Sequence, residues 1–135
     1  MNALTERWLG FARQDLTGAQ VMFREGLFNL TCFHAQQCVE KALKGLLAHR
    51  NQASPRIHAL TELLTFFSDP ELLSLRSKLT RLDDYYIPTR YPDALPGALP
   101  DGLPGKVEAA EALTLAQAVF DFVINLCDPQ PDSGH

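Results

Sequence analysis

Apolar residues recur every three to four positions in five stretches of the chain, a spacing that places them on one face of an α-helix. Four of these stretches are 3–25, 57–67, 70–86 and 106–127. The remaining stretch begins at residue 27 and ends between residues 49 and 52. No stretch shows a convincing strand pattern. The sequence therefore predicts an all-α protein, an up-and-down bundle of four long helices plus a short helix at 57–67.

The predicted helix boundaries rest on residues that commonly start or stop helices. Asn2 or Thr5 is expected to cap the first helix through a side-chain oxygen, and Gly26 to end it. Asp69 is expected to cap the fourth helix, with Pro70 at its first position. Because so short a turn separates the first two helices, we expect them to form an antiparallel hairpin.

The second helix carries polar side chains beside its apolar stripe. Those on one helical face are His34, Gln37, Lys41 and Lys44. Polar groups so close to a packing seam must be paired or must face a partner. One interpretation is a solvated or interface surface. The other is a surface that contacts phosphate or bases, with charge from the lysines and hydrogen bonds from His34 and Gln37.

Composition narrows the class of protein. The chain has 135 residues, 46% of them apolar and 21% charged, which suits one globular domain with a core. We place that domain at 1–127 and expect 128–135 to be a disordered tail. The net charge of −4 does not favour a scaffold for duplex DNA, although it allows a local basic groove.

The same survey indicates a cytoplasmic protein. No apolar run approaches the ~20 residues needed to span a bilayer, and no signal peptide is recognisable at the N-terminus. The odd number of cysteines fits a reducing compartment and small buried thiols. No His/Cys cluster indicates a metal, and no cofactor is expected.

Residues 81–93, RLDDYYIPTRYPD, combine two arginines, three tyrosines and three carboxylates. Arginine with aromatic rings suits nucleotide recognition, with charge for phosphate and rings for base stacking. The alternative is a structural corner in which Tyr86 packs its ring and Arg90 pairs with Asp93 or Asp83. The proline-rich stretch 87–105 cannot be a helix interior, and a loop of this length is usually functional or mobile.

Other motifs carry less chemistry. His58, near the start of a predicted helix, is interpreted as a capping or packing residue rather than a catalyst. The chain contains neither a nucleophile elbow nor a glycine-rich phosphate loop.

Taken in order, several segments resemble the HEPN domain family of small prokaryotic α-helical proteins. They are 12–16 (ARQDL), 32–37 (CFHAQQ), 39–44 (VEKALK), 57–60 with 63–64 (IHAL and LL) and 90–93 (RYPD). The run FHAQQxxEKALK is specific, and the resemblance covers residues 3–127, nearly the whole chain. It implies a four- or five-helix bundle, a homodimer, and a small nucleotidyltransferase as the partner in a toxin–antitoxin pair.

The resemblance also implies a choice of activities. Many family members are metal-independent RNases that use an R-x4–6-H motif near the fourth helix, whereas others bind nucleotides. In this chain Arg81 is followed by no histidine at that spacing, and His58 lies eight positions after Arg50, outside it. Metal-free RNA cleavage needs a group that takes the 2′-OH proton near neutral pH. The missing histidine weakens the RNase interpretation and leaves His34 as the candidate base.

Three hypotheses result. The first is a nucleotide- or RNA-binding module whose cleft is lined by Arg81, Tyr85, Tyr86, Arg90, Tyr91 and Asp93, with His34, Gln37 and Lys41 nearby. The second is a metal-independent endoribonuclease toxin, in which Arg81 or Arg90 stabilises charge on the phosphate and His34 acts as acid or base. The third is a purely structural helical dimer that holds a partner.

Overall fold

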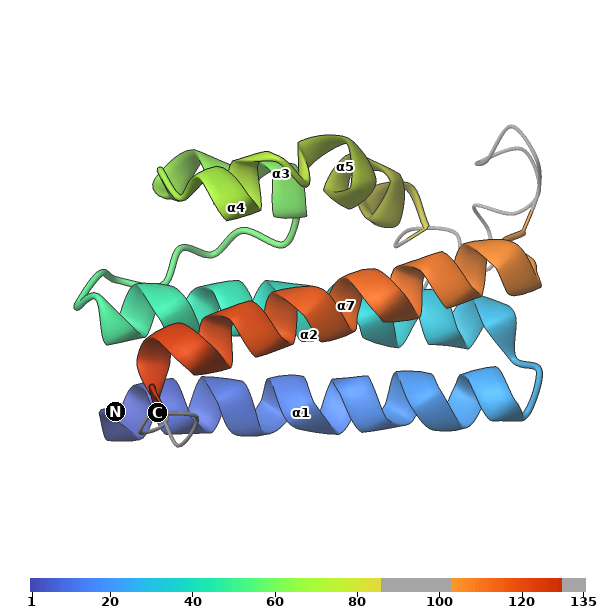
Figure 1. The fold of residues 1–135 in the computed structure, drawn as a ribbon, viewed down its shortest axis with the longest axis horizontal. Coiled ribbons are helices and arrows are strands. Elements are labelled where there is room, and N and C mark those ends of the chain that lie inside the picture. The colour runs from blue at the N-terminus through green and yellow to red at the C-terminus, as the bar shows by residue number, and fades with distance from the viewer. Residues whose placement is uncertain (86–102, 130–135) are drawn as a thin grey trace, which may run out of the picture.

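The computed structural model describes residues 1–85 and 103–129, in which every regular element is a helix (Figure 1). Three helices of 22 residues run lengthwise: α1 (Ala3–Arg24), α2 (Phe28–His49) and α7 (Lys106–Cys127). The short elements are α3 (Leu60–Leu63), the 3₁₀ helix η1 (Leu64–Phe66), α4 (Pro70–Leu73) and α5 (Arg76–Asp84). The short helices form a row across α2 and α7 on the side away from α1 (Figure 1). The predicted all-α fold class is confirmed.

The hairpin of α1 and α2 forms as predicted. The Asn2 side chain caps α1, its Oδ1 accepting a hydrogen bond from the Thr5 backbone N–H at 2.8 Å. Gly26 follows the helix with a φ of +74°, a conformation that glycine adopts without the penalty a Cβ would bring. The two helices approach closely at Gly45, where a Cβ would lie 2.9 Å from Leu9 Cδ2.

Helix α2 lies at the centre of the core because it contacts α1, α7, α3 and α5. Its fully buried apolar residues are Cys32, Ala35, Cys38, Val39, Ala42, Leu43, Leu46 and Leu47. The prediction of buried thiols is confirmed, since Cys32, Cys38 and Cys127 are all buried and free. Burial raises the pKa of both Cys32 and Cys38 to about 12, so these thiols stay protonated at neutral pH.

The fourth predicted helix is divided, and this differs from the expected continuous helix over 70–86. Helix α4 ends at Leu73 and α5 begins at Arg76. The Ser74 hydroxyl donates to the Glu71 carbonyl at 2.9 Å, and the Leu75 N–H bonds the Leu72 carbonyl three residues back. Both contacts compete with the regular ladder of helical hydrogen bonds, so the chain turns there.

Two predicted helix starts also differ. The Asp69 side chain does not cap α4, because both its oxygens accept hydrogen bonds from Arg50, each at 2.8 Å. Pro70 does occupy the first turn, as predicted. Helix α3 begins at Leu60 rather than at 57, and its first N–H groups bond a carboxylate on α5, described below.

Helix α7 has the predicted bounds of 106–127. Among the described residues, α7 is a helix whose length and composition would allow it to cross a membrane. Its most apolar window has a mean hydropathy of 1.4. This differs from the expectation that no stretch approaches that length. In the structure the helix packs on α2 and α1 and buries residues such as Ala116, Val119, Phe120 and Val123, as core helices do.

Candidate functional site

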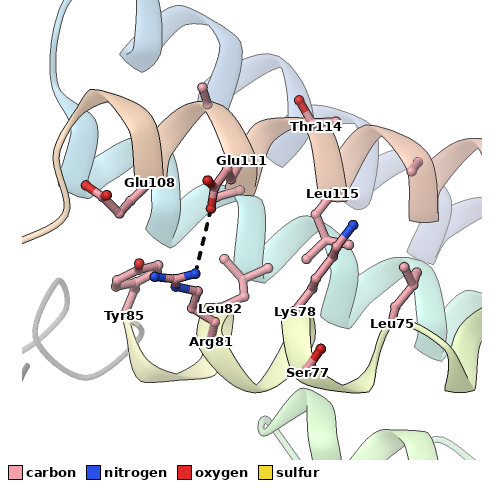
Figure 2. A pocket seen from close by; sticks show the side chains of 13 residues that line it. Leu75, Ser77, Lys78, Arg81, Leu82, Tyr85, Glu108, Glu111, Thr114 and Leu115 are labelled. Atoms are coloured by element: carbon pink, nitrogen blue, oxygen red, sulfur yellow. Dashed lines mark ion pairs between the residues drawn. The ribbon is translucent and has the colours of Figure 1, made fainter.

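A pocket of about 650 Å³ opens between α5 and α7 (Figure 2). Its apolar floor includes Leu75, Leu82, Ala112 and Leu115. Polar and charged side chains line the remainder: Ser77, Lys78, Arg81, Tyr85, Glu108, Glu111 and Thr114. Apolar walls with a few convergent polar groups are typical of sites for small ligands, and the volume lies within the usual range of roughly 300–1,000 Å³.

The α5 wall carries the positive charge of the pocket. Lys78 and Arg81 are one helical turn apart and therefore lie on the same face of α5. The Arg81 guanidinium lies beside the Tyr85 side chain (Figure 2), and its interaction with the Tyr85 hydroxyl raises the pKa of Arg81. Burial raises the pKa of Tyr85, so its phenol remains protonated at neutral pH and does not serve as a base.

The α7 wall carries the negative charge. Glu108 forms a hydrogen bond at the start of α7, where its Oε1 accepts from the Gly105 N–H at 2.7 Å. Glu111 lies one turn further on and points toward Arg81, with 4.0 Å between Oε2 and the Arg81 Nη1 (Figure 2). These two side chains, Glu111 and Arg81, are 60% and 63% exposed, so the ion pair between them is weak.

The position of α5 depends on Asp83, which lies between the two pocket residues Arg81 and Tyr85. Its Oδ1 accepts from the Leu60 N–H at 2.9 Å, and its Oδ2 accepts from the Thr61 N–H at 3.1 Å and hydroxyl at 3.3 Å. Gln36 on α2 donates to Oδ1 at 3.5 Å. Asp83 thus caps α3 from another helix and connects α5 to both α3 and α2.

A second polar cluster lies between α1 and α2. Asp15 accepts from Lys41 Nζ at 2.6 Å and pairs with His34 Nδ1 at 3.1 Å. Partial burial would raise the pKa of the Asp15 carboxyl, but hydrogen bonds from His34 and Lys41 lower it below its usual value. An ionised Asp15 can only accept from Nδ1–H, so it orients the imidazole and leaves the lone pair of the neutral ring on Nε2.

Four further polar residues of α2 are paired inside the molecule: Gln36, Gln37, Glu40 and Lys44. Gln37 donates to the Gln36 side chain at 2.8 Å, and Gln36 donates to the His58 carbonyl at 3.0 Å. Glu40 pairs with Lys44 at 3.0 Å and with His58 Nδ1 at 3.1 Å, while the Lys44 cation also lies over the Trp8 ring. The motif on α2 therefore joins the helices of the bundle.

The residues expected to line one cleft, or to lie near it, occupy two places. Arg81 and Tyr85 line the pocket, whereas His34 and Lys41 contact Asp15 and Gln37 contacts Gln36. The predicted residues Tyr86, Arg90, Tyr91 and Asp93 lie outside the described residues.

Sequence reasoning did not select five polar residues of the pocket: Ser77, Lys78, Glu108, Glu111 and Thr114. Helical spacing could have identified Ser77 and Lys78, which lie four and three residues before Arg81 on α5. No local pattern could have identified the other three, because they reach the site only through the packing of α7 beside α5.

These features define an all-α protein that belongs to the HEPN domain family, whose match extends over residues 5–126. Among solved structures, the protein TT1696 from Thermus thermophilus is 41% identical, with a TM-score of 0.75 over 88% of this chain and 94% of that one. ST0689, an archaeal HEPN homologue, is 31% identical, with a TM-score of 0.75 over 95% of this chain and 100% of that one.

A relative among curated sequences carries a functional name. It is the "Putative toxin MJ1304" of Methanocaldococcus jannaschii, which is 30% identical over 122 residues, and the match covers 83% of this chain and 80% of the relative. The protein is therefore a HEPN domain homologous to a protein of that name.

Proposed function

We propose that this HEPN protein binds a nucleotide or an RNA end in the pocket between α5 and α7. The observation that carries the proposal is the placement of Lys78 and Arg81, one turn apart, on the wall of a 650 Å³ pocket. Cationic side chains on one helix face suit a phosphate group, and arginine offers paired N–H donors to its oxygens. The apolar floor suits the faces of a base.

Tyr85 supports phosphate binding by orienting Arg81. Tyr85 is only 8% exposed, so most of the ring packs inside the protein, and the Arg81 guanidinium lies beside it (Figure 2). An arginine held by a neighbour loses less rotational freedom when it binds a ligand.

We further propose that the protein acts in the cytoplasm as a homodimer and as one half of a toxin–antitoxin-type pair, with a nucleotidyltransferase as the other half. The name of the Methanocaldococcus jannaschii relative and the family resemblance support this setting. Sedimentation of the purified chain at twice the protomer mass would support the dimer, and sedimentation as a monomer would contradict it.

The binding site can be tested with a matched pair of variants on one helix. Arg81→Ala removes the pocket cation, whereas Arg76→Ala removes an exposed cation of α5 that does not line the pocket. Titration of a fluorescent AMP analogue and of a short labelled RNA should show binding to the wild type. Because Arg81→Ala loses a charge-assisted hydrogen bond to the ligand, its affinity for the ligand should be weaker than that of the wild type by about tenfold or more. Arg76→Ala should bind as the wild type does.

Two results would contradict this assignment. Equal losses in both variants would indicate a general effect of net charge rather than a site. Absence of binding at millimolar ligand would leave the third hypothesis, a structural helical protein that only holds a partner.

A metal-independent ribonuclease is the second candidate function, and the oriented His34 favours it. With Asp15 holding Nδ1, the Nε2 atom can accept the 2′-OH proton while that oxygen attacks phosphorus and forms a 2′,3′-cyclic phosphate. The 5′ oxygen then leaves and takes up a proton from water. Cleavage of labelled RNA in EDTA should then disappear in His34→Ala and persist in His49→Ala. An inactive wild-type protein, or an active His34→Ala variant, would remove this candidate.

A further inference from the structure

The two walls of the pocket carry opposite charges. Lys78 and Arg81 lie one turn apart on α5, and Glu108 and Glu111 lie one turn apart on α7. Figure 2 shows the Glu111 carboxylate pointing across the pocket toward Arg81, whereas the Glu108 carboxylate is turned toward the start of α7. The four charged side chains sum to zero, which differs from the positive grooves that follow a nucleic-acid backbone.

This charge pattern restricts the ligands that fit. A chain of several phosphates would bring negative charge against Glu108 and Glu111, and like charges at close range repel. A ligand with a single phosphate can place it on the α5 wall and turn hydrogen-bond donors toward the α7 wall. A carboxylate has only acceptor oxygens, so it selects N–H groups and rejects carbonyl oxygens.

Glu111 is the carboxylate best placed to accept a hydrogen bond from such a donor on the ligand. The Oε1 atom of Glu108 already accepts from the Gly105 N–H at 2.7 Å. Glu111 is 60% exposed, and its 4.0 Å distance from Arg81 is longer than a hydrogen bond. A ligand phosphate can therefore bind Arg81 in place of Glu111. The Glu111 oxygens can then accept a hydrogen bond from the ligand.

We infer that the pocket takes a nucleoside monophosphate, or a nucleotide end with one phosphate, whose base bears an exocyclic amino group, and that Glu111 selects this amino group over a keto oxygen. This inference rests on the proposed function, because it assigns the base preference of the same site. Lys78 and Arg81 bind the phosphate, and Glu111 is the residue that determines specificity.

The experiment compares two pairs of ligands that differ in the exocyclic group of the base and in the proton that the neighbouring ring nitrogen carries in the keto member. AMP and IMP, and likewise CMP and UMP, carry an amino group in the first member and a keto oxygen in the second. Calorimetric titration of the wild type should show the amino member binding about tenfold more tightly in each pair that binds, the value of one hydrogen bond to a charged group.

Glu111→Gln tests the assigned residue. The glutamine amide presents both a donor and an acceptor, so the amino-to-keto affinity ratio should fall close to one. Glu71→Gln on α4 removes an exposed carboxylate outside the pocket and should leave the ratio unchanged. Because the readout is a ratio, a general loss of affinity or stability in the variant does not imitate the effect.

The outcomes separate this inference from the proposed function. Equal affinities within each pair, or a preference that persists in Glu111→Gln, would overturn the base preference. The proposed function would still hold if the binding of monophosphates depended on Arg81. Tighter binding of ATP than of AMP would overturn the single-phosphate part. Failure of all four monophosphates to bind would overturn both proposals.

Discussion

The replacement Asp83→Ala tests how the pocket is held in place. The carboxylate accepts two backbone N–H groups, from Leu60 and Thr61, at 2.9 and 3.1 Å, together with the Thr61 hydroxyl and the Gln36 amide at longer distances. Loss of an N-terminal helix cap costs about 0.5–2 kcal/mol, and each donor left unsatisfied in a buried place costs about 1–3 kcal/mol. Since Asp83 is only partly buried, water can satisfy some of these donors.

We therefore expect Asp83→Ala to lower the free energy of unfolding by about 2–3 kcal/mol, a large fraction of the roughly 5–15 kcal/mol typical of a domain. Urea denaturation followed by circular dichroism measures this change, provided that the slope with denaturant stays constant. The matched control is Asp84→Ala, which removes an exposed carboxylate next in the chain and should change stability by less than about 0.5 kcal/mol.

Equal stability of Asp83→Ala, Asp84→Ala and the wild type would refute the idea that Asp83 connects α5 to α3 and α2. The reasoning also predicts a functional effect. A helix α5 released from α3 no longer holds Lys78 and Arg81 against α7, so Asp83→Ala should weaken ligand binding although its side chain does not line the pocket.

The remaining predictions concern the α1–α2 hairpin. The pKa of Asp15 is lowered in the folded protein, so the stability it contributes is present above its unfolded value of 3.8 and is lost as pH falls through the folded pKa. The stability difference between wild type and Asp15→Asn, measured by denaturation, should therefore shrink below about pH 4, and a constant difference down to about pH 2 would contradict this. Gly45→Ala should destabilise the protein by about 1–2 kcal/mol, since overpacking against Leu9 outweighs the gain in helix propensity. Gly10→Ala, whose Cβ would meet nothing within 4 Å, should instead stabilise it by about 0.5–1 kcal/mol, and thermal melts showing the same sign for both would refute the packing argument.

The long helices were predictable because their signals are local. Helices α1, α2 and α7 each bury a stripe at helical spacing, and Asn2 and Gly26 mark boundaries through hydrogen bonds and backbone angles within a few residues. The break between α4 and α5 was missed because Ser74 fits a helix in sequence. Its choice of the Glu71 carbonyl is visible only in the structure.

The candidate site was predictable only in part. Arg81 and Tyr85 were selected because an arginine beside aromatic residues is a compositional signal. Glu108 and Glu111 carry no such signal, and they belong to the site because α7 packs beside α5. His34 and Lys41 were placed correctly on one face of α2, but their shared partner Asp15 lies 19 and 26 positions away in the chain.

By itself the sequence determined the helical fold class, the extent of the three long helices and the family, because periodicity, caps and motifs depend on neighbouring residues. The tertiary structure decided which polar side chains are satisfied internally and which line an open pocket. That distinction depends on contacts between distant segments, such as Asp83 with α3 and Arg81 with Glu111. The sequence gives the charge of a side chain, whereas tertiary packing determines which group that side chain contacts.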